Sequence, residues 1–251
     1  MNLYELERYL EDLLGVSKFK DYCPNGIQVE GKAEINTIVS GVTASQALLD
    51  RAVSLKADAV LVHHGYFWRG ESPLVRGMKK KRLATLLQHD MSLLAYHLPL
   101  DAHPELGNNV QLARCLGIKV EGTMDARELQ GVGNVGVLTE PMTLTEFALF
   151  IASALQREPT VVSGGSHLIK RIAWCTGGAQ SYIDRAVELG VDAYLSGEIS
   201  EQTTHSAREG GIHYIAAGHH ATECYGVQAL GEHLAERFGV KHLFLDLDNP
   251  A

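Results

Sequence analysis

The sequence predicts an α/β protein made of two similar α/β halves, with sheets covered by helices. Short apolar runs alternate with amphipathic stretches, which is typical of parallel strands joined by helices. In addition, residues 46–61 recur as residues 180–195, with Asp-Arg-Ala-Val and Asp-Ala-x-Leu in both copies. This echo predicts an internal duplication with halves 1–125 and 126–251 and a ligand site in the cleft between them. Chance similarity is the alternative explanation.

The composition is that of an ordinary globular chain with enough apolar residues for a sizeable core. Of its 251 residues, 45% are hydrophobic and 21% are charged. A net charge of −8 argues against a surface that binds duplex nucleic acid. The four cysteines are far apart, no apolar run is long enough to cross a membrane, and the N-terminus is acidic. We therefore expect a cytoplasmic protein with no membrane contact.

The elements of the first half follow from spacing and turn residues. Leucines at helical spacing predict a helix over 2–15 that ends at Gly15. A Pro-Asn-Gly turn then leads into a short strand, and a second strand is expected over 35–41. A helix over 44–55 precedes the apolar strand 59–62, and the next strand covers 93–96.

The first half ends with a helix over 110–116 that stops at a glycine. The composition then changes, and the glycine-rich stretch within 121–140 indicates the start of a second sheet. Thr143 with Glu146 three places on predicts a capped helix over 143–155. The stretch 216–223 carries a His-His pair and a glutamate, and a further helix runs to Gly239.

Two adjacent histidines end the strand over 59–62. In a regular strand His63 and His64 would point to opposite faces, but the turn at Gly65 lets both lean into one cleft and bind different ions. Ligands in open α/β sheets gather at the carboxyl ends of such strands. A polar loop start is an equally good explanation of these two residues alone.

Two more groups of polar residues could bind a metal. The strand over 93–96 is followed by His97, Asp101 and His103. In the second half, a helix that begins after Gly218 would place His219 and Glu223 at i and i+4 on one face, a common half-site for a divalent ion. A hydrogen-bonded surface pair would have the same spacing.

Taken together, the motifs H-H-G, H-L-P-L-D-A-H-P-E-L-G-N-N and G-H-H-A-T-E, with N-G-I-Q-V near the start, resemble one family along the whole chain. It is the Nif-three-like family of dinuclear-metal proteins, whose members are often labelled "GTP cyclohydrolase 1 type 2 homologue". The resemblance implies a duplicated α/β fold, a ring-shaped homohexamer and two divalent metal ions per subunit. The ligands that it implies are His63, His64, Asp101, His219 and Glu223.

The implied ligands limit the choice of metal. Five nitrogen and oxygen donors without a thiolate suit Zn, Mn, Fe or Ni. Three neutral imidazoles and two carboxylates leave a net charge of +2 on two divalent ions, which favours a bound hydroxide and an anionic substrate. His97 and His220 are candidates for residues that support the ligands. Weaker candidates for substrate contacts are Tyr66, His103 and Asn108.

Three functions are compatible with these observations. The first is a metal-dependent hydrolase that uses a metal-bridging hydroxide on a nucleotide-like or other small anionic substrate. The second is a non-catalytic metal-binding protein that acts in metal delivery, and the third is an interaction scaffold. The sequence favours metal binding but does not decide whether the protein is an enzyme, and the family label is no evidence for a substrate.

Overall fold

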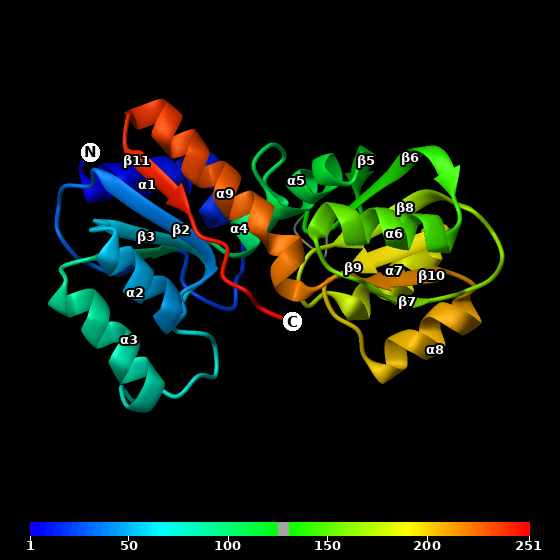
Figure 1. Ribbon diagram of the computed structural model, residues 1–251, viewed down its shortest axis with the longest axis horizontal. Coiled ribbons are helices and arrows are strands. Elements are labelled where there is room, and N and C mark those ends of the chain that lie inside the picture. Colours follow the sequence, from blue (N-terminus) through cyan, green and yellow to red (C-terminus); the bar gives the residue numbers. More distant parts are fainter. Residues whose placement is uncertain (125–130) are drawn as a thin grey trace. The chain divides into compact units, whose positions relative to one another are not determined.

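The computed structural model describes residues 1–124 and 131–251, which form two compact units (Figure 1). Unit 1 contains Met1–Leu106 and Gly226–Asp248, and unit 2 contains Gly107–Tyr225 and Asn249–Ala251. The boundary expected between residues 125 and 126 lies outside the described residues. The units instead divide at Leu106 and Gly226, because the later turns of the last helix, α9 (His219–Phe238), pack into the core of unit 1.

Unit 1 is built around a five-stranded sheet in the order β1-β4-β3-β2-β11. Its strands are β1 (Gly26–Val29), β2 (Thr37–Thr43), β3 (Ala59–His64), β4 (Ser92–Ala95) and β11 (Lys241–Phe244). All neighbours are parallel except β1, which pairs with β4 in the antiparallel direction. Strand β3 lies in the middle and is buried on both faces, as its unbroken apolar run predicts.

Helices cover both faces of this sheet (Figure 1). They are α1 (Leu3–Leu14), α2 (Gln46–Ser54), α3 (Gly77–Gln88), the short α4 (Leu98–Ala102) and the later turns of α9, with a 3-10 turn at Val16–Lys18. Leucines of α1 and α9 pack with Leu61 on one face, and those of α2 and α3 pack with Val60 on the other. Each fully buried leucine contributes about 2 kcal/mol through the removal of apolar surface from water.

The ends of α1 show why the leucine pattern becomes a helix here. The side chain of Asn2 accepts hydrogen bonds from the backbone N–H groups of Tyr4 and Glu5 at the N-terminus. Gly15 takes the left-handed conformation with φ of 62° and ends the helix. The predicted helix over 2–15 is therefore confirmed.

Unit 2 contains a six-stranded sheet in the order β5-β6-β8-β9-β10-β7. Its strands are β5 (Ile118–Thr123), β6 (Asn134–Met142), β7 (Thr160–Val162), β8 (Ile169–Cys175), β9 (Ala193–Ser196) and β10 (His213–Ala216). Its helices are α5 (Asn108–Cys115), α6 (Leu144–Leu155), α7 (Ile183–Glu188), α8 (Glu201–Gly210) and the first turns of α9, with a 3-10 turn at Gln180–Tyr182. Residues of α5 and α6 pack with Trp174 and Leu195 of the sheet to form the core.

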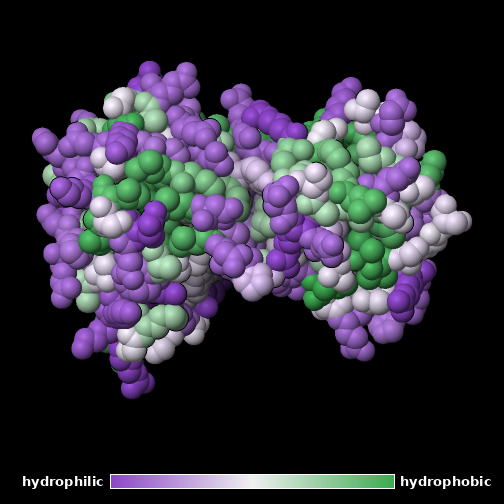
Figure 2. Space-filling model, in the orientation of Figure 1, coloured by the Kyte–Doolittle hydropathy of each residue, from purple (hydrophilic) through white to green (hydrophobic). Residues whose placement is uncertain are grey.

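Helix α6 combines a buried and an exposed apolar face. Its N-terminus carries the predicted capping box, in which Thr143 and Glu146 satisfy each other's backbone N–H groups. Phe147 and Ile151 are buried, whereas Leu149 is 67% exposed and Phe150 is 38% exposed. Figure 2 shows hydrophobic residues over this helix on the visible face of unit 2.

The two sheets share an arrangement. The order β1-β4-β3-β2 in unit 1 matches β7-β10-β9-β8 in unit 2, and both β1 and β7 are antiparallel edge strands. Asp58 Oδ2 accepts the backbone N–H groups of Asn36 and Thr37 at the start of β2. At the same position in unit 2, Asp192 Oδ2 accepts those of Lys170 and Arg171. An internal duplication would leave this pattern.

Among residues 1–124 and 131–251, no helix has both the length and the hydrophobicity that a membrane crossing requires.

Candidate metal centre

In unit 1, the carboxyl end of β3 brings two imidazoles together. His63 and His64 are consecutive strand residues, yet their ring centroids lie 4.5 Å apart with an angle of 43° between the planes. Strand hydrogen bonding continues to His64 and stops at Gly65. The rings therefore approach each other at the strand end, as the turn residue predicts.

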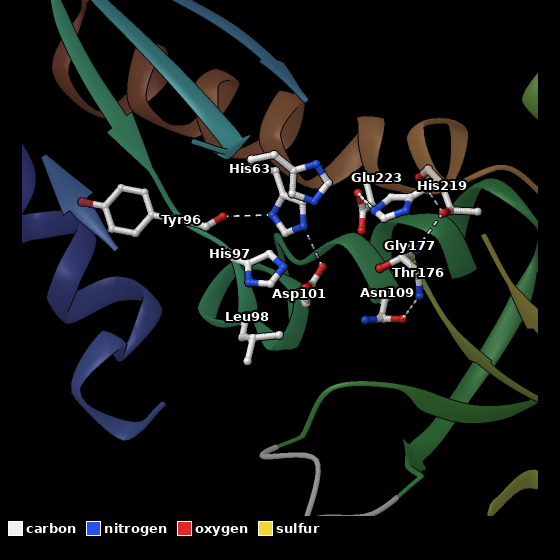
Figure 3. Close-up of polar contacts among 12 residues, drawn as sticks. His63, Tyr96, His97, Leu98, Asp101, Asn109, Thr176, Gly177, His219 and Glu223 are labelled. Carbon is white, nitrogen blue, oxygen red and sulfur yellow. Dashed lines mark hydrogen bonds and ion pairs between the residues drawn. The ribbon is translucent and has the colours of Figure 1, made fainter. Parts of the chain in front are cut away.

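His63 has a single ring nitrogen that is suited to a metal. Its Nδ1 donates a hydrogen bond of 3.0 Å to the carbonyl oxygen of Tyr96, so Nε2 is the lone-pair nitrogen of the neutral ring (Figure 3). Nε2 lies 3.5 Å from Oδ1 of Asp101, and both side chains are buried. A backbone carbonyl that fixes the tautomer of a histidine is the usual support of a metal ligand.

Two further histidines lie at the same place in unit 1. His64 has its Nδ1 3.2 Å from the hydroxyl of Thr43, at the end of β2. His97 follows β4, and one ring nitrogen from each of His63, His64 and His97 lies within 4.8 Å of the others. Three strand ends therefore contribute to one cluster.

Asp21 supports this cluster and was missed by the sequence analysis. Its Oδ1 accepts a hydrogen bond of 2.7 Å from Nδ1 of His97. Burial alone would raise the pKa of Asp21, but the hydrogen bonds from His97, Asn25 and Tyr22 lower it to about 2. The available signal was the turn that includes Asn25, which brings an aspartate beside the strands.

In unit 2, the first turn of α9 places a histidine and a glutamate on one face. Nε2 of His219 lies 3.3 Å from Oε2 of Glu223, and Nδ1 lies 2.7 Å from Oε1 of Glu198. Burial alone would lower the pKa of His219, but hydrogen bonds and charges of Glu223 and Glu198 raise it to about 9. The predicted i and i+4 pair is therefore formed, and its glutamate is almost fully buried.

Gly177 makes room for this glutamate. It follows β8, has φ of +68°, and a Cβ atom there would lie 2.0 Å from Oε1 of Glu223. Its N–H donates to the Thr222 hydroxyl at 3.0 Å, and the Thr176 N–H donates to Asn109 Oδ1 at 3.1 Å (Figure 3). The loop after β8 is thus held against α9 with no side chain between them.

The remaining candidates have other surroundings. The hydroxyl of buried Tyr66 donates to the carbonyl of Ala44. Nδ1 of His103 accepts hydrogen bonds from the backbone N–H groups of Glu105 and Leu106, in a turn after α4. Asn108 is buried at the start of α5, and half-buried His220 is in the first turn of α9. These contacts indicate a packing role for Tyr66 and a turn role for His103.

The donor atoms in both units fit a divalent metal ion. They are imidazole nitrogens and carboxylate oxygens, which suit Zn, Mn, Fe and Ni. In unit 1, burial raises the pKa of the Cys23 thiol to about 12. In the described part of the chain, which holds all four cysteines, none of them forms a disulfide.

Comparison with known proteins identifies the family. The family described as Duf34/NIF3 (NGG1p interacting factor 3) matches residues 1–250. The chain belongs to this family. It is 62% identical over 247 residues to a "GTP cyclohydrolase 1 type 2 homolog" of Pseudomonas aeruginosa. The aligned region covers 98% of this chain and 96% of the relative.

Two solved structures share the fold of this chain. One, described as "protein ybgI, unknown function", has 54% identity and a TM-score of 0.97, and the match covers all of both chains. TTHA1606 from Thermus thermophilus has 35% identity and a TM-score of 0.91, again over the full length of both. The resemblance inferred from the histidine and glutamate motifs is therefore confirmed.

Proposed function

We propose that this chain binds two divalent metal ions and is a hydrolase for a small anionic, nucleotide-like substrate. The ligands are His63, His64 and Asp101 of unit 1 with His219 and Glu223 of unit 2. The single observation that carries the proposal is the buried His63, whose Nδ1 is bound to a carbonyl while Nε2 lies 3.5 Å from Asp101.

The chemistry of the donors supports a centre that acts on anions. Three neutral imidazoles and two carboxylates carry a charge of −2, so two divalent ions retain a net charge of +2. When bound, such ions supply Lewis acidity and lower the pKa of water toward neutrality. The protein's own contribution is to hold each donor in one orientation before the ions arrive.

That orientation comes from neighbouring groups. The Tyr96 carbonyl fixes the tautomer of His63, and Glu198 accepts the Nδ1 proton of His219. Gly177 leaves space for the carboxylate of Glu223. In metal sites, such supporting contacts change metal affinity or activity by roughly 10- to 100-fold when they are removed.

The test begins with the purified protein. Elemental analysis should find two divalent ions per chain, and His63→Ala should lower this content. The metal-loaded protein is then assayed for hydrolysis of phosphoesters, amides and nucleotides, with GTP included because of the names of the relatives. A protein that binds two ions but hydrolyses none of these would support metal delivery or a scaffold role, and one that binds none would contradict the proposal.

We also propose that the protein is a cytoplasmic homo-oligomer, and specifically a hexamer, as the family resemblance implies. Four cysteines that form no disulfide among the described residues suit a reducing compartment. The exposed apolar residues Leu149 and Phe150 of α6 suit a contact with another copy.

A further inference from the structure

Asp21 and His97 form a histidine–carboxylate pair in unit 1 to which the proposed function gives no task. The side chains are 4% and 13% exposed, and Nδ1 of His97 lies 2.7 Å from Oδ1 of Asp21. Asp21 also accepts the N–H of Tyr22 at 2.6 Å, the amide of Asn25 at 2.9 Å and the N–H of Leu98 at 2.9 Å. Four donors occupy this carboxylate, so it is a fixed acceptor and not a metal ligand.

The neighbouring thiol does not turn the pair into a separate metal site. Donor atoms of Asp21, Cys23 and His97 lie within 4.8 Å of one another. Four donors already occupy the Asp21 carboxylate, however, so the three residues cannot all offer a lone pair to an ion. The role of the pair must therefore come from His97.

The hydrogen bonds determine which nitrogen of His97 carries the proton. Asp21 is ionised at neutral pH and can only accept, so Nδ1 of His97 must donate. In the neutral ring, Nε2 is then a hydrogen-bond acceptor. The backbone is fixed as well, because the His97 N–H donates to Oδ1 of Asn25 at 2.7 Å.

This imidazole belongs to the cluster at the strand ends. Its ring centroid is 5.0 Å from that of His63 and 5.7 Å from that of His64. The ring of Trp68 meets it edge-on, with 5.0 Å between centroids and 86° between planes. Figure 3 shows His97 beside His63 and Asp101. The ring is thus held between Asp21 and the proposed ligands of unit 1.

We infer that Asp21 is a positioning residue that fixes His97 as a hydrogen-bond acceptor, through Nε2, for the molecule that binds at the metal centre. The inference rests on the proposed function, because it needs a metal centre for that molecule. Unit 1 already supplies three proposed metal ligands, His63, His64 and Asp101. A catalytic metal site must keep one coordination position open for water or substrate, so His97 is not needed as a further ligand. The fitting class of ligand carries an N–H or O–H donor next to its metal-binding oxygen, as amides and hydroxylated heterocycles do.

Acetohydroxamic acid is a suitable probe, because it chelates divalent ions and carries such a donor. Its affinity for the zinc-loaded protein is measured by calorimetry for wild type, His97→Ala, Asp21→Asn and Asp21→Glu. We expect the dissociation constant to rise roughly three- to tenfold in His97→Ala and Asp21→Asn, as for the loss of one hydrogen bond, and to recover in Asp21→Glu. Acetate, which lacks the donor, should bind all four proteins equally.

Metal content separates hydrogen bonding from metal ligation. The zinc content of His97→Ala and Asp21→Asn should equal that of wild type, as should that of the exposed controls His89→Ala and Asp12→Asn. Loss of zinc from His97→Ala would make His97 a ligand and overturn the inference. Unchanged hydroxamate affinity in His97→Ala would overturn it as well.

A neutron crystal structure reports the tautomer without any assay of binding. The inference requires a hydrogen on Nδ1 of His97 and none on Nε2, and a hydrogen on Nε2 would contradict it. A wild-type protein that takes up no zinc would instead contradict the proposed function. If circular dichroism shows that Asp21→Asn does not fold, the hydroxamate affinities of His97→Ala and Asp21→Glu still test the inference.

Discussion

At the scale of single residues, Gly177 illustrates how the absence of a side chain positions a carboxylate. A Cβ atom at this residue would lie 2.0 Å from Oε1 of Glu223, and φ is +68°. We expect Gly177→Ala to displace Glu223 and to weaken metal binding by about tenfold or more. Gly190→Ala is the matched control, because Gly190 has φ of +62° and nothing within 4 Å of its Cβ position. Calorimetric titration with zinc that gives equal losses in both variants would contradict the steric explanation.

Glu223 itself should be needed for the metal content. Its side chain is 4% exposed and lies 3.3 Å from His219. The amide in Glu223→Gln has no charge to offset two cations, so we expect the loss of at least one ion per chain in elemental analysis. Exposed Glu209→Gln on α8 and His103→Ala should keep the wild-type content. Two tightly bound ions in Glu223→Gln would show that the metal content does not depend on the charge of this carboxylate.

At the scale of elements, Asp58 and its counterpart Asp192 join the starts of neighbouring strands. Asp58 accepts two backbone N–H groups of the β2 region and the ammonium group of Lys32 at 2.6 Å. We expect Asp58→Asn to lower the free energy of unfolding by about 2 kcal/mol at pH 7, as charged hydrogen bonds are lost. Asp12→Asn on α1 is the exposed control, and urea unfolding is the measurement.

The effect of Asp58 should depend on pH in a defined direction. Burial alone would raise the pKa of Asp58, but the hydrogen bonds from Lys32, Asn36 and Thr37 lower it below 3.8. A carboxylate whose pKa is lower in the folded protein contributes stability above its ordinary pKa and loses it as pH falls through the lowered value. The difference between wild type and Asp58→Asn should therefore shrink below pH 3.8. A constant difference down to the acid transition would contradict this role.

Elements with strong local signals were predictable. Leucine spacing with Gly15 defined α1, and Thr143 with Glu146 defined the start of α6. The strand expected over 35–41 runs from Thr37 to Thr43 instead, because pairing with β3 continues to His64. Strand ends depend on the neighbouring strand, which local sequence does not contain.

At the scale of the whole molecule, association should depend on α6. Leu149 is 67% exposed on this apolar helix. If α6 contacts another copy, Leu149→Glu should reduce the molar mass in light scattering at micromolar concentration, because a buried charge is costly. Leu168→Glu, at a residue that is 51% exposed outside α6, is the control. A monomeric wild-type protein would contradict the proposed oligomer.

The sequence by itself determined the α/β class, the repeated strand–helix order and the family, because apolar periodicity and the histidine motifs are local patterns. Through the resemblance of the motifs that contain them, it also predicted the metal ligands His63, His64, Asp101, His219 and Glu223. Only the tertiary structure decided which chain segments share a core. Residues 226–248 return to unit 1 because the leucines of α9 pack with those of α1.

The supporting contacts were likewise decided by the tertiary structure alone. Asp21 is hydrogen-bonded to His97, which lies 76 residues later in the sequence. Gly177 leaves room for Glu223, which lies 46 residues later. An aspartate in a turn and a glycine after a strand are common, and neither residue type indicates its distant partner. Their roles arise only when folding brings the strand ends, the turn and α9 to their places within each unit.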